Sequence, residues 1–207
     1  MLHYTAMTGG PEPALKRLRL PETEVSCHYL VGEDGSVFRL VDDDRRAWHA
    51  GAGRWGASDD LNSRSLGIEL SNDGASPFTA AQMDALEALL ALLLDRHGIA
   101  PRGVIGHSDA APGRKIDPGP RFDWRRLALL GLSIWPEPRG APEPDPARFC
   151  ADVARAGWTA DVPLDVLLGA VRLRVRPWAR GPLDATDMGL AADLARRFPV
   201  DADRNAS

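Results

Sequence analysis

A proline-rich segment divides this chain into two parts of unequal length. Five prolines stand among the twelve residues from 135 to 146, and almost no apolar side chains accompany them. Segments of this composition are extended linkers rather than parts of a packed core. We therefore predict a linker at residues 135–146, with a larger domain at residues 1–134 and a smaller one at residues 147–207.

The larger part carries patterns typical of both strands and helices. Residues 25–31 and 36–41 predict two strands, joined into a hairpin by a turn with Asp-Gly at its tip. In residues 65–71 aliphatic side chains alternate with others, which places Glu69 on the face opposite to the aliphatic ones. Residues 79–98 begin with a capping box, continue with a leucine-rich stripe and end at glycine, which predicts a helix. Strands and helices together predict the α/β class for this part.

The smaller part shows helical patterns only. Apolar stripes at residues 146–157, 163–174 and 185–198 predict three short helices that form a compact bundle. A unit of about 55 residues has a small core and often depends on a neighbouring domain for its stability. We therefore expect this bundle to lean on the larger domain.

Charge and hydropathy exclude several classes of partner. The formal net charge of −4 gives no electrostatic reason to expect nucleic acid or anionic lipid as the main partner. No run approaches the ~20 apolar residues that cross a bilayer, and the first residues lack the basic and apolar regions of a signal peptide. We therefore expect no integral membrane segment and a cytoplasmic protein, or a cell-envelope protein if a segment precedes Met1. Cys27 and Cys150 lie far apart, so we expect no disulfide framework.

The residues most suited to metal chemistry lie late in the larger part. His107 follows a short apolar segment that predicts a strand at residues 104–105. If residues 115–117 are extended, Lys115 and Asp117 project to the same side of the chain. An imidazole and a carboxylate suit zinc, which binds nitrogen and oxygen ligands and keeps one position open in catalytic sites.

A third ligand is needed to complete such a zinc site. His3 and His28 both lie in segments that could be strands, and their spacing along the chain does not choose between them. A different interpretation is an ordinary turn rich in proline and glycine at residues 117–120, with no metal. The residues alone leave both questions open.

Six short motifs, taken together, resemble those of a known family. In chain order they are LHYTAM at residues 2–7, VSCHYL at 25–30, RAWHAG at 46–51, LGIEL at 66–70, GHSD at 106–109 and KIDPGP at 115–120. In type and order these motifs are similar to those of the type 2 N-acetylmuramoyl-L-alanine amidases. That family is related to a phage lysozyme-amidase and to the peptidoglycan recognition proteins. Six motifs in one order are far more specific than any one of them.

This resemblance implies a fold and a metal site. The fold would be a mixed central β-sheet flanked by helices, with the small C-terminal three-helix domain added to it. Zinc would be held by His3, His107 and Asp117. His28 then matches a nearby position that lines or supports the site, and we assign it with the substrate-binding residues.

The resemblance also implies a reaction. Glu69 matches the family's catalytic carboxylate and Lys115 its catalytic lysine, while Trp48 and His49 match the substrate groove. Zinc lowers the pKa of water, and a carboxylate such as Glu69 can move the water's proton to the leaving amine. The implied function is zinc-dependent hydrolysis of the amide bond between the lactyl group of N-acetylmuramic acid and L-alanine, with peptidoglycan or muropeptides as the substrate.

Two other functions are compatible with the same fold. One is a non-catalytic peptidoglycan or muropeptide receptor, which would bind without turnover. The other is a zinc amidase or peptidase that cuts an unrelated amide. The presence of all five predicted metal-binding and catalytic residues favours the enzyme over the receptor.

Two features of the chain ends add further expectations. Residues 147–207 weakly resemble the peptidoglycan-binding helical modules that such enzymes often carry, although a structural cap would show the same pattern. Because only Met1 and Leu2 precede His3, we expect the first strand to fray unless other contacts hold it. The sequence makes no prediction of the oligomeric state, nor of whether the substrate is intact wall or a recycled anhydro-muropeptide.

Overall fold

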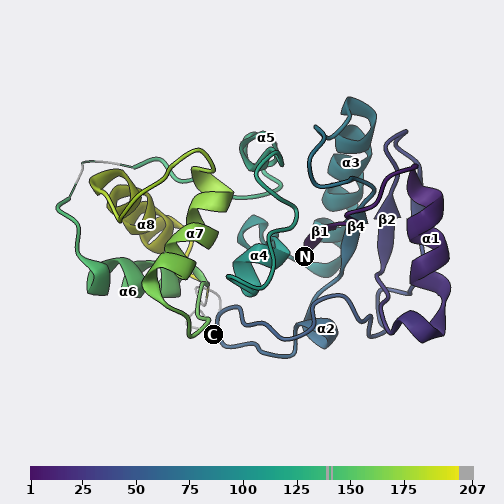
Figure 1. Ribbon diagram of the computed structural model, residues 1–207, viewed down its shortest axis with the longest axis horizontal. Coiled ribbons are helices and arrows are strands. Elements are labelled where there is room, and N and C mark those ends of the chain that lie inside the picture. The colour runs from purple at the N-terminus through teal and green to yellow at the C-terminus, as the bar shows by residue number, and fades with distance from the viewer. Residues whose placement is uncertain (139, 141, 201–207) are drawn as a thin grey trace.

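Four short strands form one mixed sheet in the larger part of the chain (Figure 1). The computed structural model describes residues 1–138, 140 and 142–200. The strands are β1 (Leu2–Tyr4), β2 (Tyr29–Val31), β3 (Val37–Arg39) and β4 (Ile68–Leu70), in the spatial order β1-β4-β2-β3. β1 and β2 each run parallel to β4, whereas β3 runs antiparallel to β2. The predicted mixed sheet is therefore confirmed, although β2, β3 and β4 are each shorter than their sequence patterns.

The first strand is held on both of its edges. It pairs with β4 on one edge, and on the other the Leu2 N–H donates to the Ile105 carbonyl at 2.8 Å. The strand predicted at residues 104–105 is thus reduced to a single bridge, between Leu2 and Gly106. His3 therefore lies in a strand with hydrogen-bonded chain on either side.

The register of the sheet places two polar side chains side by side. His3 of β1 pairs with Glu69 of β4, and Glu69 pairs in turn with Leu30 of β2. Paired residues of neighbouring strands project to the same face, so these three side chains share one face of the sheet. Ile68 and Leu70 project to the opposite face and are buried there, as the alternation predicts.

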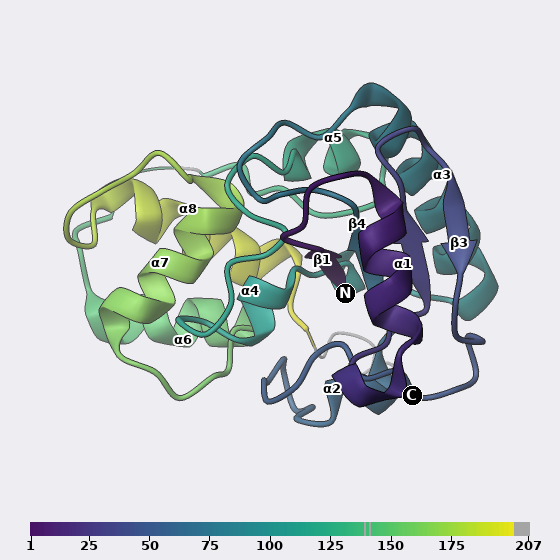
Figure 2. The same ribbon diagram turned by 45° about the vertical axis from the view of Figure 1, so that its right-hand side comes forward.

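Two helices cover the two faces of the sheet. α3 (Ala80–His97) packs its apolar stripe against the aliphatic face. α1 (Pro11–Arg19) lies on the opposite face, where Ala14 and Leu15 pack against Leu30. Figure 2 shows α1 in front of the strands and α3 behind them. α1 therefore borders the two polar side chains of the sheet.

α3 begins and ends where its sequence predicts. The Oγ1 atom of Thr79 accepts a hydrogen bond from the Gln82 N–H at 3.1 Å, which satisfies a donor that the first turn leaves free. The helix ends at Gly98, whose φ of 61° lies in the left-handed region that glycine adopts without strain.

The other elements of the larger part are short. They are η1 (Pro21–Thr23), α2 (Leu61–Arg64), η2 (Pro101–Gly103), α4 (His107–Ala110) and α5 (Trp124–Leu129). α4 and α5 lie between the sheet and the C-terminal helices (Figure 1). They therefore connect the two parts of the molecule in space.

The three predicted C-terminal helices are present. They are α6 (Pro146–Ala156), α7 (Leu164–Val175) and α8 (Ala185–Arg197). Around Phe149, Trp158 and Met188 they enclose an apolar cluster of their own. Ile134 and Trp135, at the start of the predicted linker, also pack into this cluster. The beginning of the predicted linker is therefore packed against the C-terminal helices.

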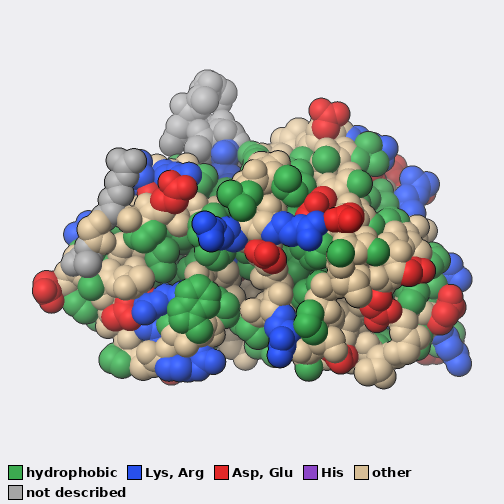
Figure 3. Space-filling model, turned by 90° about the horizontal axis from the view of Figure 1, so that it is seen from above, with side chains coloured by type: hydrophobic (Ala, Val, Ile, Leu, Met, Phe, Trp, Pro, Cys, Tyr) green, Lys and Arg blue, Asp and Glu red, His purple; other side chains and the backbone are tan. Residues whose placement is uncertain are grey.

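The structure leaves some of the predicted segments partly undescribed. Residues 139 and 141 of the linker and residues 201–207 of the helical part lie outside the described residues. Within the described chain, no helix has both the length and the hydropathy needed to cross a bilayer. On the face drawn in Figure 3, positive and negative side chains are interspersed, so that face gives a polyanion no broad cationic area to bind.

Candidate functional site

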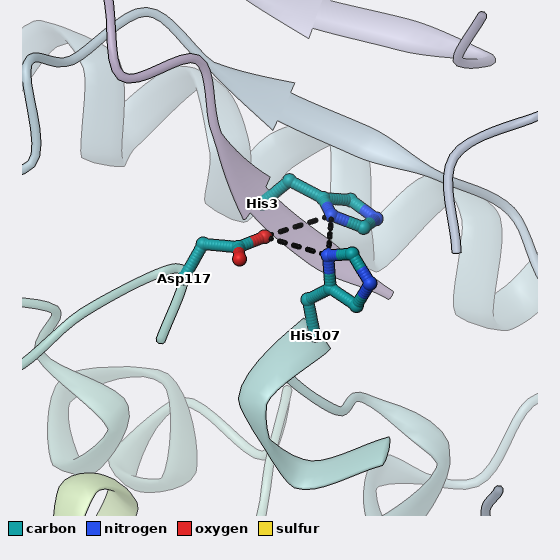
Figure 4. A group of neighbouring side chains, drawn as sticks. All are labelled: His3, His107 and Asp117. Carbon is teal, nitrogen blue, oxygen red and sulfur yellow. Dashed lines mark hydrogen bonds and ion pairs between the residues drawn. The ribbon is translucent and has the colours of Figure 1, made fainter. Parts of the chain in front are cut away.

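Three buried side chains from separate segments meet beside β1 (Figure 4). His3 lies on β1, His107 is the first residue of α4, and Asp117 follows in the loop after α4. The Nδ1 atoms of His3 and His107 are 3.0 Å apart, and Oδ2 of Asp117 lies 2.9 Å from the first and 3.0 Å from the second. The structure therefore brings His3, and not His28, to the pair that the sequence singled out.

The triangle formed by these three atoms fits a zinc ion. Zinc with nitrogen and oxygen ligands at ~2.0–2.1 Å in a tetrahedral arrangement has its ligand atoms ~3.3 Å apart, close to the distances found here. None of the three residues is more than 7% exposed, and a buried carboxylate is costly unless a positive partner accompanies it. Within the described residues, this is the one group of His, Cys, Asp and Glu side chains close enough to hold a metal ion.

Hydrogen bonds determine which nitrogen of His3 carries the proton. Nε2 of His49 lies 3.3 Å from the Ser65 carbonyl, which can only accept, so this nitrogen of His49 is protonated. Nδ1 of His49 is then an acceptor, and it receives the Nε2–H of His3 at 3.0 Å. Nδ1 of His3 keeps its lone pair, directed at His107 and Asp117. A histidine whose second nitrogen is fixed in this way has the usual arrangement of a metal ligand.

Hydrogen bonds also fix the orientation of His107 and the position of its proton. Its Nε2–H donates to the Ala50 carbonyl at 2.8 Å, and Nη2 of Arg114 donates to the same oxygen at 2.8 Å. Burial lowers the pKa of His3 to about 4 and that of His49 to about 2, so both rings are neutral near pH 7. Three acceptor atoms thus face one another, and they repel unless a cation lies among them.

Glu69 lies beside His3 in the sheet and has a buried oxygen without a partner. Its Oε2 accepts no hydrogen bond from the described residues. Burial raises the pKa of Glu69 to about 8, with a further increase from Asp117 and a decrease from Lys115. Lys115 is exposed, yet its ammonium group lies near enough for its charge to act on Glu69. A carboxyl group with such a pKa suits proton transfer near neutral pH.

Comparison with known proteins identifies the family of this chain. A family model described as "N-acetylmuramoyl-L-alanine amidase" matches residues 1–120. The chain is also 32% identical to the N-acetylmuramoyl-L-alanine amidase AmiD of Escherichia coli (strain K12), over 97% of this chain and 83% of that protein. This chain belongs to the N-acetylmuramoyl-L-alanine amidase family.

Solved structures share the fold of this amidase. E. coli AmiD in complex with anhydro-N-acetylmuramic acid-L-Ala-D-gamma-Glu-L-Lys has a TM-score of 0.85 and 31% identity, over 95% of this chain and 88% of that chain. AmpDh3 from Pseudomonas aeruginosa has a TM-score of 0.85 and 28% identity, over 95% and 90%. E. coli 1,6-anhydro-N-acetylmuramyl-L-alanine amidase AmpD is 41% identical, but over 51% of this chain and 58% of that protein. The likeness to AmiD and AmpDh3 thus extends over the helical part.

A groove on the α1 side of the amidase adjoins Glu69. A cavity of about 120 Å³ is lined by Glu69, His49 and Trp48, together with side chains of α1 and of the segment that follows β1. A larger cavity of about 590 Å³ shares Trp48 with it. Trp48 is 56% exposed, and the guanidinium of Arg46 lies 4.4 Å from the centre of its ring. Trp48 and His49, predicted from the sequence as groove residues, therefore line the space next to Glu69.

His28 is placed differently from its predicted role in substrate binding. It is 1% exposed, its Nδ1 accepts the Gly67 N–H at 2.9 Å, and its Nε2–H donates to the Arg45 carbonyl at 3.0 Å. Backbone groups thus use both ring nitrogens, which leaves neither of them for a substrate. The geometry instead gives His28 a structural part, in which it joins two loops at the start of β2.

Three supporting residues were not found by sequence reasoning. Oδ1 of Asn62 accepts the backbone N–H groups of His49 at 2.9 Å and of Ala50 at 2.8 Å. Ser65 and Arg114 act on the two histidine rings through the contacts described above. All three work largely through backbone atoms that approach them only in the folded chain, so no motif marks them.

The contribution of Glu69 to the stability of the metal-free amidase is expected to fall as pH rises from about 4.5 to about 8. The pKa of Glu69 is raised from its ordinary 4.5 to about 8, so between these values the folded state keeps a proton that the unfolded chain has lost. This contribution to stability is complete below pH 4.5, is lost as pH rises through 8, and is of the order of a few kcal/mol.

Urea unfolding of the metal-free protein at several pH values measures this effect. Glu69→Gln cannot ionise, so we expect this variant to lack that part of the pH dependence and to be more stable than wild type above pH 8. Equal pH dependence of the two proteins would show that Glu69 ionises normally.

Proposed function

We propose that this amidase uses zinc to hydrolyse the amide bond between the lactyl group of N-acetylmuramic acid and L-alanine, in peptidoglycan or in muropeptides. The observation that carries this proposal is the meeting of two imidazole lone pairs and a carboxylate oxygen within about 3 Å, beside the carboxyl group of Glu69. Membership of the amidase family supports it. So do the relatives AmiD and AmpDh3, whose structures contain anhydro-muramyl peptides.

His3, His107 and Asp117 are the residues that would hold the metal. Two neutral imidazoles and one carboxylate leave a zinc site with a net positive charge, which favours negative charge developing on the substrate. When bound, zinc supplies a Lewis acid that lowers the pKa of water toward ~7 and polarises the scissile carbonyl.

Glu69 and Lys115 are the proposed catalytic groups. Glu69 takes a proton from the attacking water and then donates it to the nitrogen of the leaving L-alanine, two roles that its raised pKa allows near neutral pH. The ammonium of Lys115 stabilises the oxyanion of the tetrahedral intermediate, an effect of about 3–4 kcal/mol for one such donor.

Trp48 and His49 are proposed to line the substrate groove beside Glu69, with Trp48 making the contact, because Ser65 and His3 already use both ring nitrogens of His49. The exposed indole of Trp48 offers an apolar face to a sugar or peptide, while the ring of His49 lies between the groove and His3. We also propose residues 1–134 as the catalytic domain. The predicted peptidoglycan-binding role of residues 147–207 stays a prediction.

The purified amidase tests this proposal directly. With zinc present it is expected to release L-Ala-D-γ-Glu-L-Lys from anhydro-N-acetylmuramic acid-L-Ala-D-γ-Glu-L-Lys, to lose that activity in excess chelator, and to regain it when zinc is returned. The same tripeptide with an acetyl group in place of the muramyl group is the control and should remain intact. Full activity in excess chelator would rule out the metal mechanism, and binding of the substrate without turnover would indicate a receptor.

A further inference from the structure

A buried ion pair joins the C-terminal helices to the segment that carries His107. Arg174 of α7 places its Nη1 2.5 Å from Oδ2 of Asp109 in α4. The side chains of both residues are 1% exposed, so water cannot take the place of either partner. Breaking such a pair leaves an uncompensated charge inside the protein.

The same guanidinium binds the His107 segment at two points. Nη1 reaches Asp109, two residues after His107, and Nη2 donates to the carbonyl of Val104, three residues before it, at 3.1 Å. Nη2 also donates to the hydroxyl of Ser133 at 3.0 Å. One rigid, planar group therefore holds both flanks of the segment that presents His107.

Asp109 connects Arg174 to the start of α4. Its Oδ2, the oxygen that Arg174 contacts, also accepts the backbone N–H of Gly106 at 2.8 Å. Gly106 directly precedes His107 and caps the helix. The direction of the His107 side chain is thus tied to the carboxylate that Arg174 holds.

Packing around Arg174 prevents other arrangements of its side chain. The guanidinium lies 3.9 Å from the centre of the Trp124 ring, in a cation–π contact. The loop after α4 is also in close contact with α7, because a Cβ atom at Gly113 would lie 2.7 Å from Cγ1 of Val166. α7 therefore supports both α4 and the loop that leads to Lys115 and Asp117.

We propose that Arg174 is a positioning residue for His107, so that the C-terminal helices complete the metal site of this amidase. The inference rests on the proposed function, since it assumes that His107 binds zinc. It gives the helical part a role in the reaction that does not depend on wall binding. Partners that orient a metal ligand commonly change metal affinity about 10–100-fold when they are removed.

Arg172 provides a matched control within the same helix. It is also buried and pairs with Asp187, with Nη2 2.5 Å from Oδ2. Among the described residues, the hydrogen bonds and ion pairs of Arg172 and Asp187 stay within the helical part and include none to α4 or to the His107 segment. Arg172→Met and Arg174→Met thus each remove one buried ion pair from α7, but only the second removes the link to His107.

The experiment measures the affinity of full-length wild type, Arg174→Met and Arg172→Met for Zn²⁺ by competition with a chromophoric chelator. It is done at a temperature where circular dichroism shows all three to be folded. We expect Arg174→Met to bind zinc about 10–100-fold more weakly than wild type. Arg172→Met should stay within about twofold of wild type. Wild-type affinity in folded Arg174→Met, or an equal loss in Arg172→Met, would overturn the proposal.

Arg174→Lys decides the question if Arg174→Met does not fold. Lysine keeps a positive charge beside Asp109, but a single ammonium cannot bind Asp109, Val104 and Ser133 in the geometry of the guanidinium. We expect about tenfold weaker zinc binding, and unchanged affinity would again overturn the proposal. Failure of wild type to bind zinc would be a different result, because it would contradict the proposed metal site itself.

Discussion

Asp117→Ala is expected to remove zinc from this amidase and to reduce turnover to that of the metal-free protein. Oδ2 of Asp117 is the charged atom of the triangle and lies 2.9 and 3.0 Å from the two histidine nitrogens. Without this carboxylate, only the two neutral imidazoles of His3 and His107 would remain to hold the zinc ion. Loss of a group that merely supports a ligand costs about 10–100-fold in affinity, so we expect loss of this ligand to cost more than about 100-fold.

Zinc content after gel filtration, together with the chelator competition described above, measures this loss. Asp117→Asn is the control for shape, because it keeps the volume of the side chain and the backbone bond from the Ser108 N–H to the residue 117 carbonyl, 2.9 Å in wild type. We expect Asp117→Asn to lose affinity as well, since it lacks the charge. One zinc ion retained per chain of Asp117→Ala would show that Asp117 is not a ligand.

Glu69→Gln is expected to keep its zinc and to lose about 10²–10⁴-fold in turnover, the usual contribution of a general acid–base group. Glu69 pairs with His3 across β1 and β4 but is not part of the triangle of ligand atoms. Glutamine has nearly the same volume and can fill the same space, so the sheet register and the three ligands should be preserved. It cannot take a proton from water, which removes the proposed step.

Steady-state hydrolysis of the anhydro-muramyl tripeptide, with zinc content measured on the same sample, checks this prediction. The loss should appear in kcat, with KM changed little, because the groove side chains Trp48 and His49 remain. If Glu69→Gln lost its zinc, Glu69 would have to be reassigned as a ligand. Near-normal turnover would place the proton transfer on another group.

Local signals in the sequence predicted most of the elements around the site. The capping Thr79 and the left-handed Gly98 mark the ends of α3, because the interactions that begin and end a helix span only a few residues. The alternation around Glu69 predicted its face for a similar reason, since the period of a strand is two residues. The strand predicted at residues 104–105 became one bridge, because strand pairing depends on a distant neighbour and α4 begins at His107.

The sequence by itself determined the kinds of residue available for the chemistry and the motifs that carry them. Residue spacing did not choose between His3 and His28, and the family resemblance implied His3. Only the tertiary structure shows how His3 reaches His107 and Asp117, which lie 104 and 114 positions away along the chain, because β1 pairs with β4 and bridges to Gly106. Two further results came from the folded chain alone: the histidine tautomers, and the link from Arg174 to the His107 segment. Each depends on hydrogen bonds between groups whose separation along the chain says nothing about their distance in space.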